Sequence, residues 1–111
     1  MKIVDHKTFL EIPTGTMFAK YEPINFGDLC FFGGKNGGRG DYSYVSLTEI
    51  DCEGSDDYIE KMLDAANKGS SVSLDLDCIG REGEYEITDQ LFAIFEKKDV
   101  AQIIEKLQKT L

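Results

Sequence analysis

The sequence predicts an α+β domain, in which about five strands form a mostly antiparallel sheet with two to three helices. Short segments of alternating or continuous apolar character, bounded by glycines, predict the strands. Longer segments with apolar residues at spacings of three and four predict the helices. A chain of 111 residues is expected to form a single domain, residues 1–111, with one modest core.

The N-terminal half predicts a short helix followed by three strands. Asp5 is a good capping residue for a helix over residues 6–12, which Pro13 ends. The glycine-rich residues 33–40 are expected to be the loop of a hairpin, because five glycines in eight residues do not hold a helix or a packed strand. The expected strands are residues 16–21, 28–32 and 41–47.

The C-terminal half predicts two amphipathic helices. Asp57 and Glu60 match a capping box, and Gly69 is expected to end that helix. Asp99 and Gln102 match a second capping box, before a C-terminal helix that we expect to pack on the sheet. The apolar faces expected to point into the core are Ile59, Met62, Leu63 and Ala66 in the first helix, and Val100, Ile103, Ile104, Leu107 and Leu111 in the second. Two strands are expected, residues 71–77 with Val72, Leu74 and Leu76 inward, and residues 91–95.

Negative charge is concentrated in one part of the chain. Residues 51–96 carry thirteen acidic and three basic side chains, and the whole chain has a net charge of −9. Charge of this sign repels nucleic acid and anionic membranes, and it attracts basic protein surfaces. We therefore expect neither direct nucleic-acid binding nor membrane binding.

The cysteines and the single histidine carry no recognisable chemistry. Cys30, Cys52 and Cys78 are odd in number and widely spaced, which predicts reduced thiols in a cytoplasmic protein and no zinc site. No apolar run is long enough to span a membrane, and the acid at Asp5 comes too early for a secretory signal. His6 has no nucleophile pattern near it and is expected to have a surface or capping role. We expect no enzyme activity, no cofactor and no metal site.

Two glycine-bearing segments supply candidate ligand-binding residues. Lys35 and Arg39 lie in the first, whose backbone amides suit phosphate, although Asn36 stands where a P-loop needs Ser or Thr. The alternative is a plain hairpin connection. In the second segment Arg81 lies between glycines, free to bind a planar anion, and Tyr85 is available for stacking. The alternative there is a turn in which Arg81 pairs with neighbouring carboxylates.

The acidic side chains supply a different set of candidates. They fit three interpretations: a solvated face, a divalent-cation site, or a surface that binds a basic partner by imitating phosphates. The cation site is disfavoured because the segment lacks the calcium-loop pattern. The candidate partner-binding residues are Asp51, Glu53, Asp56 and Asp57, with Glu82, Glu84 and Glu86.

Three short stretches resemble a group of small, acidic proteins that bacteriophages and prophages encode. They are Tyr21-Glu22-Pro23 leading into Phe26-Gly27-Asp28-Leu29, then Gly80-Arg81-Glu82-Gly83, and then Asp89-Gln90-Leu91-Phe92 running into Glu96. The resemblance implies an infected bacterial cell as the setting and an anti-defence role.

The resemblance leads to two main hypotheses. A third is that the chain is a housekeeping phage protein that makes only structural contacts. In the first, the protein binds and sequesters a nucleotide-derived immune signal, without catalysis. Its ligand-binding residues would be Arg81, Tyr85, Tyr21, Phe26, Lys35 and Arg39. In the second, the acidic candidates form a nucleic-acid-mimicking inhibitor that binds a basic surface of a defence effector such as a CRISPR complex. Either role is compatible with a homo-oligomer, and the apolar strands at residues 28–32 and 41–47 are candidates for an interface or for the core.

Overall fold

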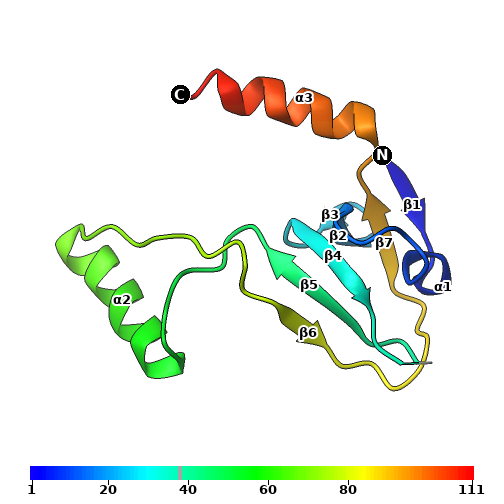
Figure 1. The fold of residues 1–111 in the computed structure, drawn as a ribbon, viewed down its shortest axis with the longest axis horizontal. Helices are drawn as coiled ribbons and strands as arrows, with labels where there is room; N and C mark the ends of the chain where they lie inside the picture. Colours follow the sequence, from blue (N-terminus) through cyan, green and yellow to red (C-terminus); the bar gives the residue numbers. More distant parts are fainter. Residues whose placement is uncertain (38) are drawn as a thin grey trace.

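A computed structural model describes residues 1–37 and 39–111 and shows one antiparallel sheet with a short helix on its core face and two longer helices outside the sheet (Figure 1). Within this part of the chain there are seven strands and three helices, so the α+β class is confirmed and five strands was an undercount. The sheet order is β1-β7-β2-β4-β5-β6, and β3 pairs with β2 outside this path. The strands are β1 (Lys2–Val4), β2 (Met17–Glu22), β3 (Asn25–Phe26), β4 (Cys30–Lys35), β5 (Tyr42–Ser46), β6 (Gly80–Glu82) and β7 (Leu91–Ile94).

The first helix, α1 (His6–Phe9), covers the core face of the sheet. Asp5 caps it as expected, because the Asp5 carboxylate accepts a 2.8 Å hydrogen bond from the Thr8 amide. The helix ends three residues before the expected Ile12. Short as it is, α1 places Phe9 in the middle of the core.

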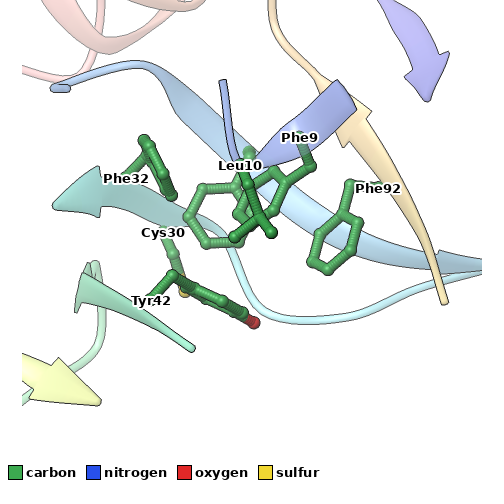
Figure 2. Packing of buried hydrophobic residues seen from close by; sticks show 7 residues of the cluster. Phe9, Leu10, Cys30, Phe32, Tyr42 and Phe92 are labelled. Carbon is green, nitrogen blue, oxygen red and sulfur yellow. The ribbon is translucent and has the colours of Figure 1, made fainter. Parts of the chain in front are cut away.

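Aromatic rings dominate that core (Figure 2). Phe9 is completely buried and stacks on Phe92, with the two ring centroids 3.8 Å apart. The other buried members of the cluster are Leu10, Phe18, Cys30, Phe32 and Tyr42. The two apolar strands that were open to either interpretation, β4 and β5, thus contribute Cys30, Phe32 and Tyr42 to the core.

The hairpin between β4 and β5 is tighter than expected, because β4 continues through two glycines. A β-carbon on Gly33 would lie 3.0 Å from the backbone of Ser43, and Gly34 has a φ of +105° at a shift in the ladder. Both positions therefore need glycine for strand pairing and not only for a turn. The loop expected across the glycine-rich segment begins only after Lys35, and its residue Gly38 lies outside the described residues.

Residues 47–79 leave the sheet as an arm with α2 (Ser55–Lys68) at its far end (Figure 1). The strand expected at residues 71–77 is wrong: Leu74 forms only an isolated bridge with Ile50, and Val72, Leu74 and Leu76 are exposed. The alternating pattern finds no neighbouring strand, because β6 takes the place beside β5 at the edge of the sheet. β6 itself lies within residues 78–88, where the sequence predicts a polar loop and no strand.

Neither long helix buries a residue. The helix α2 begins at Ser55, two residues before the expected cap, and ends at Gly69 with a left-handed φ of 71°, as expected. The helix α3 (Lys97–Gln108) begins with a capping box between Glu96 and Asp99, so Asp99 is its third residue and not its cap. None of the helices described is long and apolar enough to cross a membrane.

The expectation that the C-terminal helix packs on the sheet is wrong. In Figure 1, α3 projects away from the end of β7, and none of its residues is buried. Phe95 and Glu96 connect β7 to α3, and the helix that follows leaves its apolar face off the sheet. The core face is covered by α1 instead.

Candidate functional site

A pocket of about 420 Å³ opens beside α1 on the core face of the sheet. This volume is within the range of small-molecule sites. Its inner end is formed by buried residues, and its walls come from β2 with the following turn and from the loop that precedes β7. The lining residues are His6, Tyr42 and Phe92, then Lys20, Tyr21, Glu22 and Pro23, then Glu84, Thr88, Asp89, Gln90 and Leu91.

His6 holds two distant segments together at the inner end of the pocket. Its Nδ1 accepts a 2.9 Å hydrogen bond from the Thr88 amide, so Nε2 carries the ring hydrogen and donates to the Gly40 carbonyl at 3.0 Å. Only 1% of His6 is exposed, so the expected surface or capping role is wrong. The reason is tertiary, since both hydrogen-bonding partners lie far from His6 in the sequence.

The walls of the pocket carry more hydrogen-bond acceptors, mainly carboxylates, than cationic groups. Among the described residues of the lining, Lys20 is the one cationic side chain, and its Nζ lies 3.3 Å from a carboxylate oxygen of Glu82. The side-chain amide of Gln90 donates to the carbonyls of Tyr21 at 3.1 Å and Leu91 at 2.9 Å, which fixes that wall. Burial raises the pKa of the Tyr42 hydroxyl, which keeps it neutral and able to donate. Such a lining favours a ligand rich in hydroxyl and N–H groups.

An arginine cluster, defined by Arg39, Asp41, Arg81 and Tyr85, lies next to the pocket. The Arg81 guanidinium forms an ion pair with Asp41, and the Arg39 guanidinium lies 5.7 Å from the centre of the Tyr85 ring. Asp41 also accepts a 2.6 Å hydrogen bond from the amide of Glu84, which is a pocket residue. Asp41 therefore joins the cluster to the pocket wall.

The ion pair of Arg81 matches one part of the alternative that we left open, the pairing of this arginine with a carboxylate, but Arg81 lies on the strand β6 and not in a turn. Its hydrogen bond to Asp41 holds the pKa of that carboxyl below its ordinary value. The pair is not sealed from solvent, because two thirds of the Arg81 side chain is exposed. An incoming anion can therefore reach the guanidinium.

The six predicted ligand-binding residues do not form one site. Arg39, Arg81 and Tyr85 belong to the arginine cluster, whereas Tyr21 lines the pocket. The exposed ring of Phe26 packs on Tyr21 with centroids 5.2 Å apart. Lys35 lies elsewhere, where its Nζ pairs with Glu11 at 2.7 Å.

The acidic candidates also divide into two groups. Asp51, Glu53, Asp56 and Asp57 lie on the arm at the start of α2, whereas Glu82 lies on β6, and Glu84 and Glu86 follow it. Two of the second group touch the pocket region, since Glu84 lines it and Glu82 pairs with Lys20. Over residues 1–37 and 39–111, no group of three or more His, Cys, Asp or Glu side chains is arranged to hold a metal ion.

Sequence reasoning did not single out Lys20, Tyr42 or Gln90, although all three line the pocket. Each comes from a different segment, and none belongs to a local motif with known chemistry. Gln90 lies in one of the stretches that carry the phage resemblance, which was the only available signal. Comparison with known proteins adds nothing to these assignments: no protein family, curated protein or solved structure matches the chain.

Proposed function

We propose that this protein is a non-enzymatic binding protein that captures a nucleotide-derived small molecule, of the kind used as an immune signal, and withholds it. The observation that carries the proposal is the link through Asp41, which places two arginines and an exposed tyrosine beside a polar pocket. A nucleotide needs two such neighbouring environments, one for the nucleoside and one for the phosphates.

The pocket suits the nucleoside part of such a ligand. The carboxylates of Glu84 and Asp89 accept hydrogen bonds from ribose hydroxyls and base N–H groups, and the Tyr21 ring provides an apolar wall. The same carboxylates repel phosphate. The nucleoside therefore enters the pocket while the phosphates remain outside it.

The arginine cluster suits the phosphate part. A guanidinium binds phosphate with two parallel hydrogen bonds, and Arg81 makes this contact when phosphate replaces Asp41 as its partner. Arg39 adds a second positive charge from its position over Tyr85. The net charge of the chain is negative, but charges close to a bound phosphate act on it more strongly than distant ones.

Two further observations support binding without catalysis. Both ring nitrogens of His6, the single histidine, are engaged in hydrogen bonds that hold segments together. Burial raises the pKa of the Cys30 thiol to about 11, which leaves it protonated at neutral pH and a poor nucleophile.

The test is calorimetric titration of the protein with cyclic dinucleotides, cyclic oligonucleotides and cyclic ADP-ribose isomers. We expect one class to bind saturably. Arg81→Ala should then weaken binding about 10- to 100-fold, because a hydrogen bond to a charged group is worth about 1.5–3 kcal/mol. Glu84→Gln should weaken it through loss of an acceptor in the pocket wall.

Lys35→Met is the matched control, because it removes a cation that pairs with Glu11 away from the pocket. It should leave the affinity unchanged. The proposal is wrong if no ligand of the panel binds, or if a bound ligand is indifferent to both Arg81→Ala and Glu84→Gln.

A further inference from the structure

Two amphipathic helices leave their apolar faces uncovered. On α2 the exposed apolar residues are Tyr58, Ile59, Met62 and Leu63; on α3 they include Ile104 and Leu107, and Leu111 follows that helix. Ile59 and Leu63 are each 55% exposed, and Leu107 is 60% exposed. Apolar stripes of this extent on a protein surface mark sites of association.

The arm exposes further apolar side chains after α2 ends. Val72, Leu74, Leu76 and Ile79 are exposed on the strand-like segment that follows α2. Backbone hydrogen bonds of 2.8 Å from Asp51 to Ser73 and from Asp75 to Glu49 hold the two sides of the arm together. The arm is thus an ordered surface with an apolar stripe and no layer covering it.

The charges of the two uncovered surfaces are opposite. Residues 51–79 of the arm carry eight acidic and two basic side chains, whereas residues 97–111 carry four basic and two acidic ones. Contact between two arms would bring like charges together, and so would contact between two C-terminal helices. An arm against a C-terminal helix combines apolar contact with charge attraction.

A hollow beside α3 provides a place for apolar side chains of the arm. Its volume is about 630 Å³, and it lies between Met1, Phe95 and the helix residues Ile103 and Leu107. Lys106 and Lys109 also line it, beside Asp99 and Glu105, so the excess of positive charge that would meet the acidic arm comes from residues 97–111 as a whole.

The arm and α3 of a single copy lie apart. In Figure 1 the arm extends to the left of the sheet, whereas α3 begins beyond the end of β7 and runs above the sheet, apart from α2. A second copy of the chain carries both complementary surfaces. With two-fold symmetry, each α3 meets the arm of the other copy, so the same contact forms twice and every stripe is covered in one closed assembly.

We propose that this chain forms a reciprocal dimer, in which α3 of each copy packs on the arm of its partner. The proposal is independent of the ligand proposed above, because the pocket beside α1 takes no part in it. Leu63 and Ile59 of one copy lie against Ile103 and Leu107 of the other, with Lys106 and Lys109 facing acidic residues of the arm.

Sedimentation velocity of the purified chain tests the dimer. We expect twice the mass of the 12.4 kDa chain at micromolar concentrations, and weaker association at high salt. Leu63→Asp in the arm and Leu107→Asp in α3 should each give monomers that keep the circular dichroism of the wild type. Ile24→Asp is the matched control, because Ile24 is 99% exposed on a turn away from both surfaces, and this variant should remain a dimer.

Mixing the two monomeric variants tests which surfaces meet. The Leu63→Asp chain keeps an intact α3, and the Leu107→Asp chain keeps an intact arm, so an equimolar mixture should recover a dimer through one undamaged contact. A contact between two C-terminal helices would instead be lost with Leu107→Asp alone and not recovered on mixing. Loss of the dimer without recovery on mixing would overturn the proposal, and so would a wild-type chain that stays monomeric at hundreds of micromolar. In either case the arm would be a surface for a different, basic protein.

Discussion

Single residues set the inner end of the pocket. His6 bridges Gly40 and Thr88, and Gly40 itself is buried against that bridge. A β-carbon at Gly40 would lie 2.6 Å from the carbonyl oxygen of Glu86 and 2.7 Å from the His6 ring. Neither group has room to move, because the backbone and the doubly hydrogen-bonded ring are both held in place. Glycine is required here by close approach and not by an unusual φ.

Gly40→Ala should therefore destabilise the fold by about 1–3 kcal/mol, as overpacked sites typically do. Urea denaturation measures the change in the free energy of unfolding. Gly83→Ala is the control, because nothing lies within 4 Å of its added carbon, and its effect should stay within about 0.5 kcal/mol. Similar urea midpoints for Gly40→Ala and Gly83→Ala would show that the backbone around Gly40 moves to accommodate the added carbon.

The ion pair of Asp41 predicts a pH dependence of stability. The pKa of Asp41 is lowered in the folded protein, first of all by its hydrogen bond with Arg81. A lowered carboxyl pKa stabilises the fold above the unfolded value of about 4, and this contribution is lost as the pH falls through the folded pKa. Asp41→Asn should therefore be less stable than the wild type at pH 7, and the difference should shrink towards pH 3.

Urea midpoints at the two pH values measure this difference. Arg81→Ala should behave in the same way, since it removes the partner that lowers the pKa. A stability gap that is as large at pH 3 as at pH 7 would mean that the carboxylate charge contributes nothing.

At the scale of elements, the shortest helix does the most for the core. The four residues of α1 place Phe9 against Phe92, Phe18, Phe32 and Tyr42, whereas the long helices α2 and α3 bury no residue. Helix length thus does not measure a helix's contribution to stability. What counts is whether the chain path brings its apolar face to the sheet.

Phe9→Ala should cost about 3–5 kcal/mol, the usual loss when a fully buried phenylalanine is truncated. Phe26→Ala is the matched control, because Phe26 is 50% exposed and packs mainly on Tyr21, and it should cost far less. Thermal unfolding followed by circular dichroism compares the two. If both variants lost the same amount of stability, the core would not lie beneath α1.

At the scale of the whole molecule, ligand binding and assembly are placed on different surfaces. The pocket lies on the core face beside α1, whereas the arm and α3 lie outside the sheet (Figure 1). The acidic arm and the basic C-terminal segment also separate the charges of the chain. The two proposals therefore fail or succeed independently: a monomeric Leu107→Asp variant should still bind whatever ligand the wild type binds.

Several local features could be predicted from the sequence because they depend on neighbouring residues alone. The cap at Asp5, the helix end at Gly69 and the strands β2, β5 and β7 follow from side-chain type and apolar spacing. Part of the arginine cluster was also foreseen, since a lone arginine between glycines on an acidic segment is well placed to meet an anion or a carboxylate.

Only the tertiary structure decided what each of these segments meets. The apolar spacing of residues 97–108 determines that α3 has an apolar face, but only the tertiary structure shows that none of its residues is buried against the sheet. The alternation at residues 71–77 likewise meets no strand of the sheet, because β6 pairs with β5 and the segment forms only a single bridge, between Leu74 and Ile50. The pocket gathers His6, Lys20, Tyr42 and Gln90 from four separate segments. Local spacing specifies which face of a segment is apolar, whereas burial depends on the path of the chain and on side chains far away in sequence.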